Sequence, residues 1–249
     1  DRGLQADTVL SALTNQRATL LYQPIVNLHG RTQDIYEVRV ALYDEKGSAY
    51  STAQAVERVE QSGEASKLDL WVLDQVLRQL RQQRERGRQV RFFVKLSQQS
   101  VRDEGTLLAI SRAIRDSGLS AEALTFEIDY QVASHQIKKA RAVVNVLREL
   151  GCRTALSRFG GGLNSFNVLN HVDVDYLKID PQAISNLTDN PQRANALRQL
   201  HDKARALGKE TIATTVQDAN TLAFLWQCGI RYAQGHYIQE PSRELSYEF

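Results

Sequence analysis

Charged side chains stand at or near the ends of several short apolar segments, and they are the residues of this chain most able to do chemistry. They are Glu37, Arg39, Lys95, Glu127, Arg158, Lys178 and Asp180. Inward-facing charges are costly in a protein unless they are paired or solvated. The set therefore predicts either a cluster of internal ion pairs or a polar pocket, in which guanidinium and ammonium groups bind the phosphates of an anionic ligand.

A run of three glycines, residues 160–162, follows Arg158 and raises the question of a phosphate-binding loop. No Gly-Lys-Ser/Thr follows the run, and it does not fit the Gly-x-Gly-x-x-Gly dinucleotide pattern. Ser157 lacks the Gly-x-Ser-x-Gly surroundings of a hydrolase nucleophile. The five histidines show no metal-ligand spacing, so we interpret them as surface or capping residues.

Composition is that of an ordinary globular domain. The 249 residues carry 31 basic and 29 acidic side chains, a net charge of +2, which does not favour a nucleic-acid partner.

No apolar run reaches the ~18 residues of a membrane span, and no secretory leader opens the chain, so we expect no membrane insertion. Cys152 and Cys228 are expected to be reduced thiols in the cytoplasm. The absence of methionine suggests a fragment of a larger multidomain protein.

Strand-like and helical patterns alternate along the chain, which predicts an α/β fold with parallel strands and helices outside them. The strand-like segments are 20–26, 35–43, 90–96, 124–128, 154–157, 176–179, 211–216 and 231–235. Eight such segments favour a TIM-barrel-like (β/α)8 fold, with a doubly wound open sheet as the alternative. The short connection 27–34 leaves no room for a helix, so the first two strands are expected to form an antiparallel hairpin.

We expect one domain. Residues 1–19 carry a leading helix, over 6–18, that belongs to the same unit as residues 20–249. In a barrel of this kind, functional residues lie where the strands end and the loops begin. The charged residues above are therefore predicted to meet at one mouth of the barrel.

Nine motifs occur in an order that identifies a family. They are LYQPIV at 21–26, YEVRV at 36–40, LDLWVL at 68–73, FVKLS at 93–97, LTFEI at 124–128, ALSRFGGG at 155–162, DYLKID at 175–180, IATTVQ at 212–217 and AQGH at 233–236. With these motifs the chain resembles the EAL domains, the cyclic di-GMP phosphodiesterases of bacteria, from about residue 20 to 241. The resemblance implies the same barrel fold.

The resemblance also implies where a catalytic metal site would be. Active EAL domains bind two divalent metals through carboxylates and one asparagine, and the metals activate the attacking water. Of the seven matching positions, Glu37 and Glu127 keep the carboxylate. The five substituted positions are Lys95, Ser157, Arg158, Thr214 and Gln217. Mg²⁺ and Mn²⁺ require hard oxygen ligands, so we predict no catalytic residues, no metal and no phosphodiesterase activity.

A catalytically inactive cyclic di-GMP receptor is the first functional hypothesis. The chain looks most like the FimX-type EAL domains, degenerate receptors that regulate type IV pili and contact a PilZ-domain protein; motility and biofilm control would follow. EAL domains often dimerise, so a homodimer is also expected by resemblance. The candidate ligand-binding residues are Gln23, Pro24, Glu37, Arg39, Lys95, Glu127, Arg158, Lys178, Asp180, Gln217, Gln234, Gly235 and Pro241.

The alternative hypothesis is an interaction scaffold that has lost the nucleotide as well. The family's phosphate-binding arginine aligns with Ala41, which argues against binding. Strand alternation nevertheless places Arg39 on the same face as Glu37. Lys95 and Arg158 could neutralise phosphates in place of metals, or they could pair with Glu37 and Glu127 and close the pocket. The sequence leaves both possibilities open.

Overall fold

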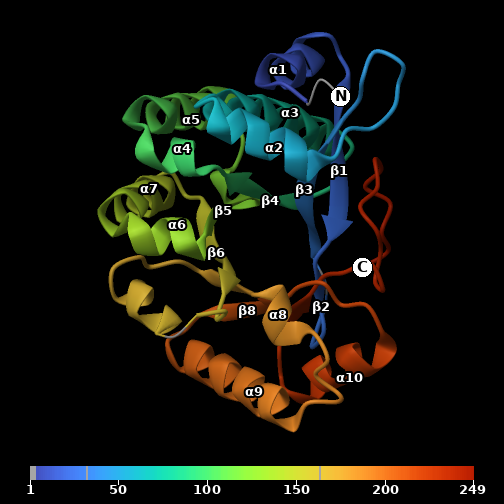
Figure 1. The fold of residues 1–249 in the computed structure, drawn as a ribbon, viewed down its shortest axis with the longest axis vertical. Helices are drawn as coiled ribbons and strands as arrows, with labels where there is room; N and C mark the ends of the chain where they lie inside the picture. The colour runs from blue at the N-terminus through green and yellow to red at the C-terminus, as the bar shows by residue number, and fades with distance from the viewer. Residues whose placement is uncertain (1–3, 32, 163) are drawn as a thin grey trace.

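The computed structural model describes residues 4–31, 33–162 and 164–249. Nine strands form one sheet in the order β1-β3-β4-β5-β6-β7-β8-β9-β2 (Figure 1). The strands are β1 (Ala18–Pro24), β2 (Val26–Asn27), β3 (Asp34–Leu42), β4 (Val90–Leu96), β5 (Leu124–Asp129), β6 (Arg153–Phe159), β7 (Tyr176–Ile179), β8 (Glu210–Ala213) and β9 (Tyr232–Ala233). All pairs from β3 to β9 are parallel.

The segment β1–β2 nearly closes the sheet into a barrel. Strand β1 pairs antiparallel with β3, whereas β2 pairs antiparallel with β9 at the other end of the sheet. Only Ile25 separates the two strands, so one stretch of chain bridges the first and last strands of the sheet. The TIM-barrel-like fold with an antiparallel first hairpin is confirmed, and the open doubly wound alternative is excluded. The predicted strand 20–26 is divided at Ile25 because its two halves pair with different neighbours.

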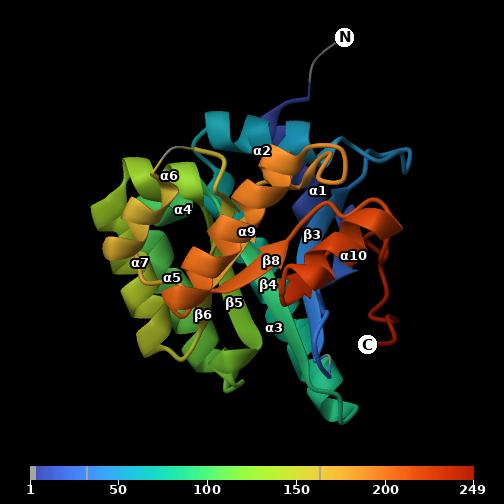
Figure 2. The ribbon, with the colours of Figure 1, turned by 90° about the horizontal axis from the view of Figure 1, so that it is seen from below.

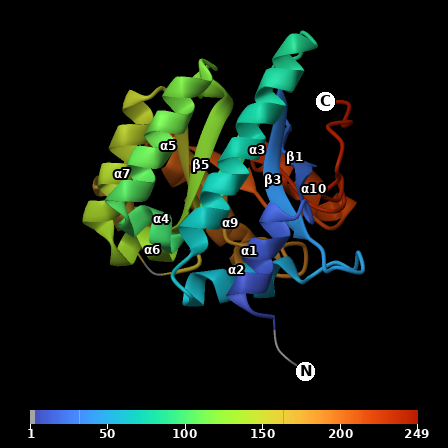
Figure 3. The same ribbon diagram turned by 90° about the horizontal axis from the view of Figure 1, so that it is seen from above.

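Helices cover the outside of the barrel. They are α1 (Ala6–Thr14), α2 (Thr52–Gln61), α3 (Ala65–Glu85), α4 (Gln98–Arg102), α5 (Glu104–Ser117), α6 (Tyr130–His135), α7 (Ile137–Glu149), α8 (Pro181–Ile184), α9 (Pro191–Ala206) and α10 (Ala219–Gln227), with 3-10 turns η1 (Ala121–Ala123) and η2 (Ser165–Asn170). Figure 2 shows α9 against β8, and Figure 3 shows α3, α5 and α7 in a row outside the strands. No helix in the described ranges is long and apolar enough to cross a membrane.

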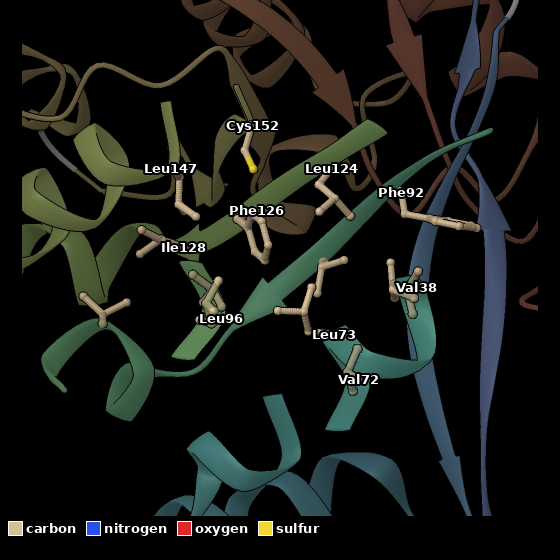
Figure 4. Close-up of a cluster of buried hydrophobic side chains, with 14 of the residues drawn as sticks. Val38, Val72, Leu73, Phe92, Leu96, Leu124, Phe126, Ile128, Leu147 and Cys152 are labelled. Atoms are coloured by element: carbon tan, nitrogen blue, oxygen red, sulfur yellow. The ribbon is translucent and has the colours of Figure 1, made fainter. Parts of the chain in front are cut away.

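The main core lies between the helices and the outward faces of the strands. Figure 4 shows Phe92 and Phe126 from the strands with Val72 and Leu73 from α3 in this layer. These positions follow the predicted periods of 3.6 on helices and 2 on strands. A second, smaller cluster fills the barrel interior with Ile25, Ile35, Phe93, Ala155, Tyr176 and Ile212. Because strand side chains alternate, Glu37, Lys95, Glu127 and Lys178 continue this inner face toward the C-terminal ends of the strands.

Among the predicted boundaries that differ from the structure, two differ for clear local reasons. The predicted strand 211–216 ends at Ala213, because Val216 instead bonds across the barrel top: its N–H donates to Gln234 O at 3.1 Å and its carbonyl accepts from Tyr237 N at 3.1 Å. The predicted helix over 6–18 ends at Thr14, since residue 18 already starts β1.

The buried imidazole of His201 on α9 makes the stability of the fold depend on pH. Its Nδ1 lies 2.8 Å from Thr211 Oγ1, and its Nε2 has no hydrogen-bond partner among the described residues. Burial lowers the pKa of His201. As the pH falls below about 6.5, the unfolded chain takes up a proton that the folded chain resists, so stability is lost. Above that pH neither state carries the proton.

We therefore expect the wild-type free energy of unfolding to fall more steeply between pH 7.5 and 5.5 than that of His201→Gln. Urea denaturation followed by circular dichroism at each pH measures the difference. His171→Gln, at an exposed histidine, is the matched control and should keep the wild-type slope. An unchanged slope in His201→Gln would contradict the assignment.

Candidate functional site

An ion triplet occupies the centre of the barrel mouth. The ammonium of Lys178, on β7, contacts Glu37 Oε2 on β3 and Glu127 Oε1 on β5. All three side chains are at most 4% exposed. The ring of Phe93 lies beneath the ammonium, with Nζ 5.1 Å from its centroid. One cation therefore holds two buried carboxylates that would otherwise repel each other.

The two carboxylates are not equivalent. Burial opposes ionisation of Glu37, but the nearby cations Lys178, Lys95 and Arg39 outweigh it, so its pKa is well below the usual range. Burial, helped by the negative charge of Glu37, raises the pKa of Glu127 to about 7 despite Lys178. The contact from Lys178 to Oε1 lies outside hydrogen-bond geometry, and Oε2 has no hydrogen-bond partner among the described residues. Glu127 is thus the less well satisfied carboxylate.

A chain of hydrogen bonds extends the triplet across the first strand to the C-terminal segment. Arg39 donates from Nε to Glu37 Oε1 at 3.1 Å and from Nη2 to Gln23 Oε1 at 2.9 Å. Gln23 Oε1 also accepts from Gln234 Nε2 at 3.1 Å, and Gln23 Nε2 donates to Gln239 O at 3.2 Å. Gln23 and Gln234 are buried, whereas the Arg39 side chain is 40% exposed. Arg39 is therefore the partly exposed member of this chain of hydrogen bonds.

Two more cations stand on the rim, and neither makes the ion pair of the closed-pocket alternative. Lys95 is exposed on β4 beside Glu127 and forms no ion pair with any described residue. Arg158 pairs with Asp129 instead of Glu127, and its side chain is 59% exposed. The register of β6 against β7 shifts between Leu156 and Phe159, and Arg158, within this part of the strand, has a φ of 50°. The closed-pocket pairs Lys95–Glu37 and Arg158–Glu127 are absent because Lys178 takes both carboxylates.

The remaining candidates divide between the mouth and its edges. Asp180 follows β7 and caps α8, its Oδ1 accepting from Gln182 N at 2.8 Å. Gln217 is exposed beyond β8, and no described contact joins it to the charged cluster. Pro24 is buried at the end of β1, and Pro241 is half-buried after Gln239. These four stay predictions as ligand-binding residues.

Gly235 is buried beside Val216. A Cβ on Gly235 would come within 2.3 Å of the Val216 backbone nitrogen and oxygen. The loop beginning at Gln234 can therefore approach the barrel top this closely only with glycine at this position.

Sequence reasoning missed two contacts of the site. Asp129 is the partner of Arg158, and its place two residues after Glu127 on the same strand face was the available signal. The backbone carbonyl of Gln239 is the partner of Gln23, and no side-chain pattern marks a carbonyl acceptor.

The EAL domain family model matches residues 6–241. The chain belongs to the EAL domain family. In sequence it is similar to the Cyclic di-GMP phosphodiesterase PdeF of Escherichia coli K12, 27% identical over 242 residues, which are 97% of this chain and 32% of PdeF. The chain spans about a third of the length of the curated relatives that it matches.

Solved EAL domains show the same fold. The crystal structure of a FimX EAL domain superposes with a TM-score of 0.95 and 33% identity, and the match covers all of both chains. The FimX EAL domain of Pseudomonas aeruginosa, bound to c-di-GMP, gives a TM-score of 0.92 and 32% identity, covering 98% of this EAL domain and 99% of that chain.

The residues at the family's metal positions do not fit a divalent metal. Both retained carboxylates of this EAL domain already hold the Lys178 ammonium, and Lys95 and Arg158 bring further positive charge. In the part of the chain that the structure describes, no group of three or more His, Cys, Asp and Glu side chains is placed to hold a metal ion. Hard cations require several oxygen ligands, so we derive no catalytic step through a metal.

Proposed function

We propose that this EAL domain is a catalytically inactive, metal-free receptor for cyclic di-GMP. The observation that carries the proposal is a cation at two of the family's metal-ligand positions: Lys95 is exposed on β4 beside Glu127, and Arg158 is paired with Asp129 on the rim. A two-metal reaction needs an attacking water activated by metal, and this site offers a fixed cation instead. The FimX EAL domain of Pseudomonas aeruginosa, solved with c-di-GMP, supports the choice of ligand.

The cations of the mouth supply the phosphate chemistry of the proposal. The Arg39 side chain is partly exposed, Lys95 is free of ion pairs among the described residues, and Arg158 is mostly exposed on the rim. Guanidinium and ammonium groups bind phosphate oxygens through charge-assisted hydrogen bonds. Three such groups around one opening fit a ligand with two phosphodiesters. Control of type IV pili, motility or biofilm, a PilZ-domain partner and a homodimer belong to the same proposal.

The scaffold alternative is favoured by one observation. The Arg39 guanidinium already bonds Glu37 and Gln23, so a ligand has to replace or share those bonds. A mouth satisfied in this way could be closed to nucleotides and serve only to hold the fold. The two functions differ in whether the domain takes up cyclic di-GMP at all.

Calorimetric titration with cyclic di-GMP in the presence of EDTA separates them. We expect wild-type binding at micromolar affinity or tighter, and at least a tenfold loss in Arg39→Ala, because a hydrogen bond to a charged group is worth about 1.5–3 kcal/mol and 1.4 kcal/mol is tenfold. Arg78→Ala is the matched control, since Arg78 pairs with Asp74 on the outside of α3. Affinity should also fall as salt rises.

Two outcomes would count against the proposal. An absence of heat at high ligand concentration would leave the scaffold function. Turnover of cyclic di-GMP with Mn²⁺, abolished by Glu37→Ala, would overturn the inactive assignment.

A further inference from the structure

The C-terminal segment 242–249 runs along the outside of the β1–β3 hairpin, and we name it the C-terminal strap. Figure 1 shows it in red beside β1. No helix lies between β1 and β3 in the sequence. Within the strap, Leu245, Tyr247 and Phe249 are half-buried and pack against the core, whereas Ser246 and Glu248 are exposed. This alternation is that of an extended segment with one apolar face.

Backbone and aromatic contacts hold the strap on both strands. Tyr22 N donates to Ser242 O at 2.7 Å, and Ser242 N donates to Tyr22 O at 2.9 Å. Farther along, Tyr247 N donates to Tyr36 Oη at 3.2 Å. The ring of Phe249 stands edge-on to that of Tyr36, with 5.3 Å between centroids. The strap thus covers a fully buried tyrosine of the barrel wall.

Two arginines bind the first half of the strap. Arg243 donates from Nη2 to Tyr43 Oη at 2.6 Å and lies over the Tyr43 ring. Arg88 donates to the carbonyl of Leu245 and pairs with Asp34. Tyr43 follows the C-terminal end of β3 and Asp34 begins it, so groups at both ends of this strand bind the strap, directly or through Arg88.

Gln23 connects the strap to the mouth. It follows Tyr22 on β1, and strand alternation points Tyr22 outward to the strap side and Gln23 inward. The Gln23 amide donates to Gln239 O, three residues before Ser242, while its carbonyl accepts from Arg39 and Gln234. Gln23 is 1% exposed, so no water can replace these partners without local opening. Any shift of Arg39 or of the Gln239 backbone therefore acts on the strap through one side chain.

We propose that docking of the C-terminal strap and occupancy of the mouth are coupled through Gln23, so that an anionic nucleotide in the mouth tightens the strap. The ligand half of this inference rests on the proposed receptor function. Coupling is reciprocal, so a variant that releases the strap weakens the ligand by the same factor by which the ligand tightens the strap. The strap then reports the state of the mouth to whatever the outer face of β1–β3 contacts.

Hydrogen exchange of residues 242–249 tests the coupling directly. In wild type, saturating cyclic di-GMP should slow exchange across the strap. The release variant Tyr247→Ala/Phe249→Ala should bind cyclic di-GMP about 5-fold or more weakly, at the lower end of typical coupling. The control variant Ser246→Ala/Glu248→Ala changes only the exposed positions of the same segment and should bind as wild type does.

A ligand-free arm keeps the inference separate from the receptor function. Gln23→Ala, without any nucleotide, should speed exchange of the strap, because Gln239 O loses its donor. If wild type binds no cyclic di-GMP, the receptor function fails, and the Gln23→Ala arm still decides whether mouth and strap are linked. Two results would overturn the coupling. One is hydrogen exchange of the strap at the wild-type rate in Gln23→Ala, and the other is wild-type affinity for cyclic di-GMP in the release variant.

Discussion

Replacing Lys178 with methionine is expected to lower the free energy of unfolding by about 3–5 kcal/mol, the usual cost of removing one partner from a buried ion pair. Lys178 holds Glu37 and Glu127, and all three side chains are at most 4% exposed. Without the ammonium, the buried Glu127 loses the cation in contact with it, and Glu37 keeps only its pair with Arg39. Desolvation and like-charge repulsion then both oppose folding.

Chemical denaturation of wild type and Lys178→Met measures this loss. The compensating variant Lys178→Met/Glu37→Gln/Glu127→Gln removes the two charges together with the lysine and should recover most of the stability, since buried ion pairs often exchange with neutral groups at little cost. Lys67→Met is the matched surface control: its pair with Glu64 is exposed and should cost less than about 1 kcal/mol. If Lys178→Met were as stable as wild type, the prediction would be wrong, and the two carboxylates would have to become protonated without cost.

The fold could be predicted from the sequence because its signals are local and repeated. Each segment rich in β-branched and apolar residues became a strand, and the helical patterns between them became helices that pack on the barrel. Closure at Ile25 was not predictable in detail. The division of β1 from β2 depends on how far β9 lies from β3, which is set by the whole barrel and by no residue near Ile25.

The sequence predicts which face of a strand each charged residue of the site occupies, but not which residue it pairs with. Alternation along the strands places Glu37, Arg39, Glu127 and Lys178 on the inner face. It cannot decide which of several long cations reaches which carboxylate, because that depends on the width of the barrel. Lys178 contacts both carboxylates across the interior. Arg158 is directed to the rim by its positive φ, a backbone conformation that the neighbouring sequence does not predict.

Replacing Gly235 with alanine is also expected to have a large effect. The free energy of unfolding of Gly235→Ala should be lower than that of wild type by about 3 kcal/mol or more. The added Cβ would meet the backbone nitrogen and oxygen of Val216 at 2.3 Å. Val216 cannot retreat freely, because its N–H is bonded to Gln234 O and its carbonyl to Tyr237 N. Overpacking against fixed backbone costs 1–3 kcal/mol and occasionally more.

Thermal and urea unfolding of Gly235→Ala measure the loss, with Gly162→Ala as the matched control, since a Cβ at Gly162 would meet no atom within 4 Å. The two glycines separate two roles. Gly162 is the last glycine of the run after Arg158, and space is open there, whereas a Cβ at Gly160 would meet Leu200 and one at Gly161 would meet Asp180. Gly235 begins the turn that carries Gln239 to Gln23, so the displaced loop should also lose the hydrogen bond between them. Gly235→Ala is then expected to speed hydrogen exchange at the mouth as well as to lower stability, and wild-type stability in this variant would contradict the packing argument.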